Sequence, residues 1–106
     1  MSRYSLFAEL KAKPGKEEDL AKFLASAQAL AEAEPGTTAW FAVRFDESTF
    51  AVFDTFDTES GRQAHLNGQI AAALHEHAPE LLSAAPEIRR ADMLAENRSG
   101  AEIGDL

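Results

Sequence analysis

The fold is decided by two neighbouring stretches, TTAWFAVRF at residues 37–45 and TFAVFDTF at residues 49–56. Both are rich in aromatic and β-branched side chains, which pack well on a pleated surface. The three residues between them, Asp46-Glu47-Ser48, have the composition of a turn. The two stretches therefore predict a β-hairpin.

The hairpin does not show the polar and apolar alternation of a sheet that has one wet face. In its first strand, one parity holds Ala39, Phe41, Val43 and Phe45, and the other holds Thr38, Trp40 and Ala42. Helices can cover only one face, and an uncovered aromatic face would exceed the apolar patches usual on monomers. We therefore expect a homodimer that packs sheet to sheet in a barrel-like shape, with an apolar cavity inside.

Working outward from the hairpin, hydrophobic periodicity predicts the remaining elements. We expect strands at 4–12 and 87–95, a helix at 16–34, and a helical region at 58–84 that Asn67-Gly68 interrupts. The order β-α-β-β-α-β is typical of a ferredoxin-like α+β sandwich, a four-stranded antiparallel sheet with both helices on one face. Residues 1–95 form the predicted domain, and residues 96–106 form a polar tail or an arm that reaches a dimer partner.

Composition narrows the class of protein. The chain has 106 residues, a formal net charge of −8 and no cysteine, which fits one domain without disulfides or a Cys-ligated metal. An excess of acids disfavours nucleic acid and anionic membranes as partners. No apolar run reaches the ~20 residues of a membrane helix, and no signal-peptide pattern is present, so we expect a cytoplasmic protein.

Few residues are candidates for chemistry. His65 is the best base by residue type, because its ordinary pKa lies near neutral pH. Asp54 interrupts an apolar strand, and burial would raise its pKa and fit it to act as a base or to bind a hydroxyl. The alternative for each is a structural role: His65 caps or packs a helix at the edge of the sheet, and Asp54 is exposed or forms a salt bridge. No dinucleotide or phosphate-loop motif is present, and His75 and His77 lie two apart, so we expect no metal site.

Aromatic side chains supply candidates for substrate binding. Trp40 can stack on a planar ring and donate its N–H, although packing in a dimer core is the alternative. The other aromatic candidates are Phe7, Phe41, Phe53 and Phe56, for which core packing is again the alternative. Tyr4, Ser5 and Arg44 are weaker polar candidates for the same site.

Several short motifs, in order over residues 4–95, resemble the antibiotic biosynthesis monooxygenase superfamily of dimeric α/β barrels. Lys13-Pro14-Gly15-Lys16 resembles its helix entry, and Glu34-Pro35-Gly36 its second turn. Residues 50–57, FAVFDTFD, resemble its third strand, where an acid two before an aromatic residue is common. Ala64-His65 resembles a pair on its second helix, and residues 81–88 resemble its closing segment.

The resemblance implies a small dimer that oxygenates a phenolic, anthrone-like or quinol compound with dioxygen, without flavin, haem or metal. A related branch degrades haem with an Asn on the first strand, a Trp and the second-helix His. Here Ala8 stands near the position of that Asn, and no Trp lies near His65 in the sequence. This departure argues against haem degradation.

Cofactor-free oxygen chemistry requires an electron-rich substrate that loses a proton inside a dry pocket. The sequence thus favours a cofactor-independent monooxygenase that acts on a small aromatic substrate. Two alternatives remain open at this point. One is a non-catalytic dimeric module that binds a small molecule, and the other is an isomerase or decarboxylase that uses the same pocket.

Overall fold

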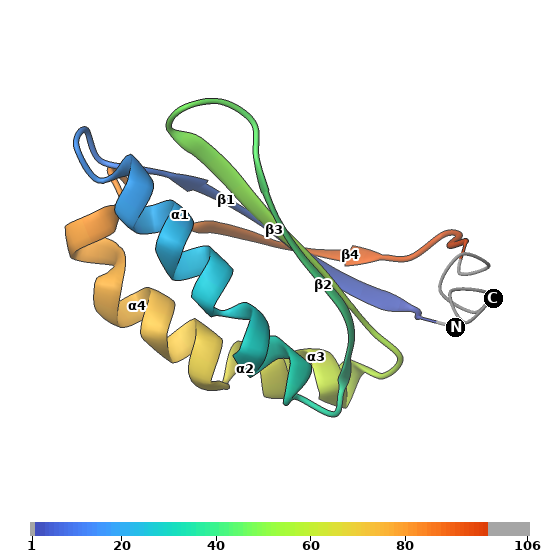
Figure 1. Ribbon diagram of the computed structural model, residues 1–106. Helices are drawn as coiled ribbons and strands as arrows, with labels where there is room; N and C mark the ends of the chain where they lie inside the picture. Colours follow the sequence, from blue (N-terminus) through green and yellow to red (C-terminus); the bar gives the residue numbers. More distant parts are fainter. Residues whose placement is uncertain (1, 98–106) are drawn as a thin grey trace, which may run out of the picture.

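The computed structural model describes residues 2–97 and has the predicted order of strands and helices. In Figure 1 all helices lie on one side of the sheet. This confirms the ferredoxin-like α+β sandwich. The elements are β1 (Tyr4–Lys11), α1 (Glu17–Ser26), α2 (Gln28–Glu32), β2 (Thr37–Arg44), β3 (Thr49–Phe56), α3 (Glu59–Leu66), α4 (Gln69–Leu81) and β4 (Glu87–Asp92).

The four strands pair antiparallel in the order β2-β3-β1-β4, so β2 and β4 are the edges. The register places Phe7 opposite Phe53, and Phe53 opposite Phe41. The next row is formed by Leu6, Asp54 and Trp40. Residues directly opposite each other share a face, and successive residues alternate between faces. The two rows therefore lie on opposite faces of the sheet.

The helices differ from the prediction in one detail. The helix expected at 16–34 is divided at Ala27, whose N–H donates to the carbonyl oxygens of both Phe23 and Leu24 at 3.1 Å. This shared hydrogen bond tightens the turn without any Gly or Pro, which is why the sequence pattern missed it. The predicted break at Asn67-Gly68 is confirmed between α3 and α4, and the Thr58 hydroxyl caps α3 by accepting from Gly61 N–H at 3.0 Å.

The core lies between the sheet and the helices. One cluster fills the end near the start of α1 and the end of α4, and it consists of Leu10, Ala12, Leu20, Leu24, Phe50, Leu81 and Leu82. A second and smaller cluster lies near the division between α1 and α2, where Trp40 packs against Ala27, Ala31 and Ile70.

The other face of the sheet carries no helix (Figure 1). Large apolar side chains on and beside β2 are exposed there, with exposed fractions of 55% for Phe41, 47% for Val43 and 63% for Phe45. The predicted surplus of apolar side chains on the far face is thus present in the single chain.

The last strand, β4, ends at Asp92, which is shorter than the predicted 87–95. Of the predicted tail, residues 98–106 lie outside the described residues. A carboxylate oxygen of Glu96 accepts a hydrogen bond from the backbone N–H of Ser2. Across residues 2–97, none of the helices has the length and apolar character that crossing a bilayer requires.

Candidate functional site

A buried histidine lies between two carboxylates at one end of the helix–sheet interior. His65 projects from α3, and its Nε2 lies 2.8 Å from Oδ2 of Asp54 on β3. Its Nδ1 lies 2.6 Å from Oε1 of Glu34, which precedes β2. The exposed fractions of the side chains are 9% for His65, 2% for Asp54 and 21% for Glu34. The structure therefore brings together both residues predicted to be catalytic, and it adds Glu34.

Close backbone packing allows Glu34 to reach His65. A Cβ atom on Gly36 would lie 3.0 Å from Cα of Gly61, so the turn before β2 lies directly on α3. Gly61 precedes His65 by one helical turn, on the same face of α3. A Cβ on Gly68 would lie 3.1 Å from Oε2 of Glu34, so the third glycine leaves room for this carboxylate. The contact between Glu34 and His65 is thus built into the backbone.

The two carboxylates determine the charge of His65. Burial alone would lower the pKa of this imidazole, but the hydrogen bonds and negative charges of Asp54 and Glu34 outweigh it and raise the pKa to about 9. His65 is therefore an imidazolium at neutral pH, and both of its nitrogens donate hydrogen bonds. In that charge state the ring has no free lone pair for a proton, so the role of His65 as a general base stays a prediction that this geometry disfavours.

Asp54 and His65 line an apolar cavity, here called the inner cavity, with a volume of about 60 Å³. It lies between the sheet and the helices of one chain, and its apolar lining includes Leu6, Ala8, Leu10, Phe23, Val52 and Leu74. The sequence predicted a cavity enclosed between two subunits. The cavity that contains the candidate residues instead lies within the single chain, because Asp54 and Trp40 point to the helix side.

Two buried polar atoms of residues that line this cavity have no hydrogen-bond partner. They are Oδ1 of Asp54, an acceptor, and Nε1 of Trp40, a donor. The two residues are directly opposite each other in the pairing of β2 with β3. Buried polar atoms are almost always paired, so each exception requires an explanation. A hydroxyl group has the chemistry to pair with both kinds of atom, because it can donate to a carboxylate and accept from an indole.

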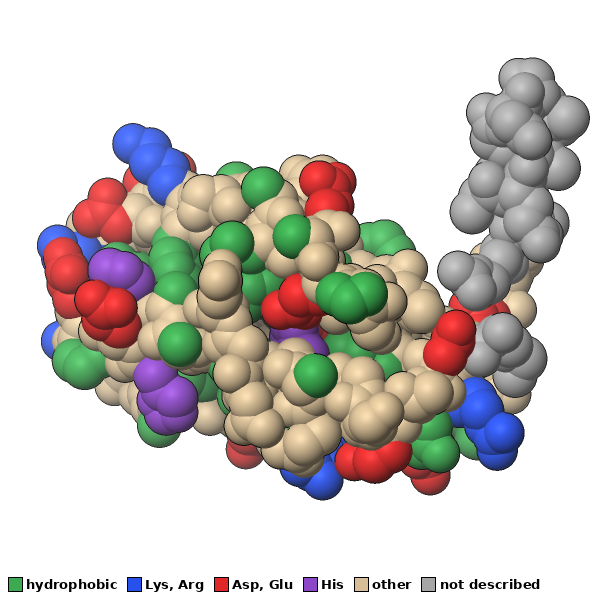
Figure 2. All heavy atoms as spheres, turned by 90° about the horizontal axis from the view of Figure 1, so that it is seen from below, with side chains coloured by type: hydrophobic (Ala, Val, Ile, Leu, Met, Phe, Trp, Pro, Cys, Tyr) green, Lys and Arg blue, Asp and Glu red, His purple; other side chains and the backbone are tan. Residues whose placement is uncertain are grey.

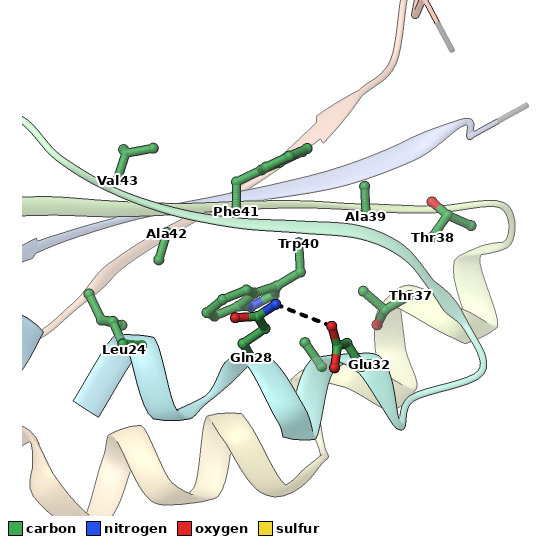
Figure 3. A pocket seen from close by; sticks show the side chains of 12 residues that line it. Leu24, Gln28, Glu32, Thr37, Thr38, Ala39, Trp40, Phe41, Ala42 and Val43 are labelled. Carbon is green, nitrogen blue, oxygen red and sulfur yellow. Dashed lines mark hydrogen bonds between the residues drawn. The ribbon is translucent and has the colours of Figure 1, made fainter. Parts of the chain in front are cut away.

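Trp40 also lines a second and larger space, here called the outer groove. This groove has a volume of about 480 Å³ and runs between β2 and the helices α1 and α2. In Figure 3 the indole ring of Trp40 points from β2 toward these helices, and Gln28 and Glu32 lie along the groove joined by a 3.2 Å hydrogen bond. Trp40 and Leu24 line both the groove and the inner cavity. The indole ring is therefore part of the wall between the two spaces.

A third space, the side cleft, lies on the other side of His65. It measures about 310 Å³ and is lined by Glu34, His65, Gly36, Gly61 and Gly68, among others. In Figure 2, which views the helical side, a histidine and an acidic side chain are visible together in a hollow. His65 thus borders the inner cavity on one side and the side cleft on the other.

The other predicted substrate-binding residues lie outside the inner cavity. Phe7 and Phe41 are on the far face with Phe53, so they do not share the cavity of His65 and Asp54. Phe41 does line the outer groove. The ring of Phe56 is fully buried 5.4 Å from the His65 ring, where it supports the imidazole without lining the cavity. Tyr4 lies 5.1 Å from the guanidinium of Arg62.

The other two weaker polar candidates take part in structural contacts. The Ser5 hydroxyl donates to the carbonyl oxygen of Ala91 at 3.2 Å, at the pairing of β1 with β4. Arg44 lies over the Phe50 ring and bonds Glu18 and the carbonyl oxygens of the hairpin turn. Neither residue lines the inner cavity.

This geometry bears on whether the cavity can hold a haem and whether the chain can bind a metal ion. The expectation that no Trp lies near His65 is wrong in space, because Trp40 lines the same cavity. Ala8 also lines it and offers no amide. The inner cavity by itself, at about 60 Å³, is far below the roughly 300–1,000 Å³ of ligand pockets and is too small for a haem. Within residues 2–97, no three His, Cys, Asp or Glu side chains are arranged to share a metal ion.

Sequence reasoning missed Glu34 because the contact joins residues 31 apart in the chain. The available signal was the turn Glu34-Pro35-Gly36, which ends a helix and returns the chain to the sheet. A carboxylate at such a turn is usually solvated. Only the close approach of Gly36 and Gly61 places it against α3.

Solved structures of other proteins have the same architecture. A Nitrosomonas europaea protein named "Putative antibiotic biosynthesis monooxygenase" is 14% identical, with a TM-score of 0.78 over 87% of this chain and 99% of that one. One of the same name from Caulobacter crescentus is 20% identical, with a TM-score of 0.77 over 89% and 92%. The resemblance to the antibiotic biosynthesis monooxygenase superfamily is thereby confirmed at the level of the fold.

A much closer relative gives the family. The NE2512 protein of Nitrosomonas europaea, described as of unknown function, is 60% identical over 92% of this chain and 94% of its own, with a TM-score of 0.90. The chain belongs to the same family as NE2512. Neither a protein-family model nor a curated protein matches the sequence.

Proposed function

We propose that this protein is a cofactor-independent monooxygenase that acts on a small aromatic compound bearing a hydroxyl group. The observation that carries the proposal is the pair of unpartnered atoms, Asp54 Oδ1 and Trp40 Nε1, in residues that line an apolar cavity beside an imidazolium. The fold shared with proteins named as monooxygenases supports the same class of reaction.

In this proposal the ligand hydroxyl donates to Asp54 Oδ1 and accepts from the indole N–H of Trp40. Asp54 takes a proton from the substrate, either from the hydroxyl or from an adjacent ring methylene. The positive charge of His65 lies against Asp54 and stabilises the anion that forms, because charges interact strongly in an apolar site. Glu34 holds the imidazolium from the other side.

For an anthrone-like ring methylene the reaction balances without a further reductant. The carbanion passes one electron to dioxygen, and the two radicals combine into a peroxide anion, which takes back the proton from Asp54. Asp54 then removes the second hydrogen of that carbon as a proton, the O–O bond breaks, and hydroxide leaves. Hydroxide takes the proton from Asp54. The methylene becomes a carbonyl, and the second oxygen atom becomes water.

Oxygen uptake with a panel of anthrones, dihydroxynaphthalenes and reduced menadione tests this proposal. We expect uptake by the wild-type protein, and a loss of at least 100-fold in Asp54→Asn, which keeps the shape of the side chain but removes the base. Asp57→Asn is the matched control, because Asp57 is exposed beyond the end of β3. Uptake that persists in Asp54→Asn would overturn the assigned role of Asp54.

Two other outcomes correspond to the alternative functions. Tight binding of the panel without any uptake would identify a binding module. Conversion of a compound without consumption of oxygen would identify an isomerase or a decarboxylase.

We also propose that two copies pair through the far face of the sheet. The support is the exposure of Phe41, Val43 and Phe45 on a face that no helix covers. Light scattering behind a sizing column should give a mass about twice 11.5 kDa. A species of single-chain mass at micromolar concentration would contradict the pairing.

A further inference from the structure

The inner cavity by itself is too small for the ligands considered above. Its volume of about 60 Å³ compares with roughly 300–1,000 Å³ for typical ligand pockets, whereas the outer groove, at about 480 Å³, falls in that range. Asp54 lines the small cavity and not the groove. A ligand that reaches Asp54 and extends beyond one ring therefore has to occupy both spaces.

The side chain between the two spaces is Trp40, and its surroundings leave it room to move. Its indole N–H bonds no other group. The ring packs against Ala27 and Ala31, which are small, at the division between α1 and α2, and against Ile70 of α4. Two residues further along the same face of β2 is Ala42, again a small side chain. The strand itself is an edge strand, and its register shifts between Thr37 and Ala39, just before Trp40.

We propose that the indole ring of Trp40 is a movable wall, which turns to join the outer groove and the inner cavity into one site for a two-ring hydroxylated aromatic compound. This inference rests on the proposed function for the class of its ligand. One hydroxyl reaches Asp54 Oδ1 at the inner end. The second ring lies in the groove beside Leu24, and a second polar substituent reaches Gln28 and Glu32 (Figure 3).

The polar end of the groove gives the ligand its orientation. Gln28 and Glu32 bond each other at 3.2 Å in the free protein. A hydroxyl at the far end of a two-ring ligand can insert between them, since it both donates and accepts. A compound with hydroxyls at opposite ends, 2,6-dihydroxynaphthalene, therefore suits the joined site better than 2-naphthol, which has one hydroxyl.

The composition of the chain permits a direct test, because Trp40 is its single tryptophan. Protein labelled with 5-fluorotryptophan should give one ¹⁹F resonance, which reports on this ring alone. Under anaerobic conditions, we expect 2,6-dihydroxynaphthalene to shift this resonance saturably, with the affinity that calorimetry measures. If the resonance stays unchanged in protein that calorimetry shows to be saturated, the wall does not move and the inference is wrong.

Variants sharpen the test. Trp40→Ala removes the wall, so the association rate constant of 2,6-dihydroxynaphthalene should rise at least tenfold. Phe53→Ala is the matched control, since Phe53 is an aromatic residue of β3 on the far face that lines neither the inner cavity nor the outer groove, and it should leave the rate unchanged. Gln28→Ala should weaken binding of the diol about fivefold and leave 2-naphthol unaffected. If Trp40→Ala does not fold, the ¹⁹F measurement on the unmutated sequence decides.

The outcomes separate this inference from the proposed function. A ligand-dependent ¹⁹F shift without oxygen uptake on any substrate supports the movable wall and contradicts the proposed monooxygenase activity. The opposite result is oxygen uptake with single-ring phenols and no binding of 2,6-dihydroxynaphthalene at millimolar concentration. It would support the proposed monooxygenase activity and overturn the movable wall.

Discussion

The helix–sheet interior has two ends of opposite character. At the end near the start of α1, the core is wholly apolar, and Leu10, Leu20 and Phe50 are at most 2% exposed. At the end near α3, the same layer contains Asp54 and His65, which are 2% and 8% exposed. Buried charge is costly and persists only when it is paired. The comparison indicates that the apolar end holds the chain together, whereas the charged end is the part of the core on which the proposed function depends.

The first prediction has the largest expected effect on stability and concerns the charged end. His65→Leu removes the cation between Asp54 and Glu34 and leaves a buried carboxylate without a counter-charge. We expect the free energy of unfolding to fall by about 3–5 kcal/mol at pH 7.5. Urea denaturation followed by circular dichroism measures this loss. The slope of the unfolding free energy against urea concentration should stay the same, which checks for two-state behaviour.

A double variant shows whether the loss comes from the orphaned charge. In His65→Leu/Asp54→Leu the buried pair is replaced by apolar side chains, a change that is often neutral or stabilising. The double variant should regain most of the stability. If it is less stable than His65→Leu, the missing imidazole packing is the cause, and the contrast between the two ends disappears.

The second prediction concerns pH. The pKa of His65 is raised from 6.5 to about 9 in the folded chain, so the folded state binds its proton more tightly than the unfolded state. This contribution is fully present below pH 6.5 and is lost as the pH rises through 9. We expect the unfolding free energy to decrease by on the order of 3 kcal/mol over that interval. A flat profile between pH 6.5 and 9.5 would contradict the raised pKa.

The apolar end provides the control for this pH profile. Leu20→Ala creates a cavity at a fully buried position, and we expect a loss of about 2–5 kcal/mol at every pH. Its profile should run parallel to that of the wild-type chain. A change of slope in Leu20→Ala would mean that the two ends are coupled.

Local pattern was sufficient to predict the fold. Periodicity predicted the hairpin of β2 and β3, the break at Asn67-Gly68 and the order of the elements, because those features depend on neighbours in the chain. The same reasoning singled out His65 and Asp54 as polar residues within apolar surroundings. It also recognised that both faces of the hairpin are apolar.

The remaining features depend on contacts between distant segments. Parity along β2 separates Trp40 from Phe41, but it does not tell which of the two rows the helices cover. The cavity was therefore expected between subunits, and Phe7 and Phe41 were grouped with Trp40. The charge state of His65 was also not predicted, because one of the two carboxylates that pair with it comes from Glu34, in a turn far along the chain. Pairing of buried charges is a tertiary property that residue type alone does not reveal.

The third prediction is the smallest and isolates this distant carboxylate. In Glu34→Gln the amide oxygen can still accept from Nδ1–H of His65, so the hydrogen bond remains and only the negative charge is lost. The pKa of His65 should fall by about one unit, since a single neighbouring charge has an effect of that size. Histidine titration by NMR measures it. Glu32→Gln is the control, because Glu32 bonds Gln28 in the outer groove and not His65. If the pKa of His65 falls in both variants, the cause is the lower net negative charge of the chain and not the contact with Glu34. A fall in neither would leave Asp54 alone as the residue that keeps the imidazole charged, and Glu34 would then be a structural hydrogen-bond acceptor at the side cleft.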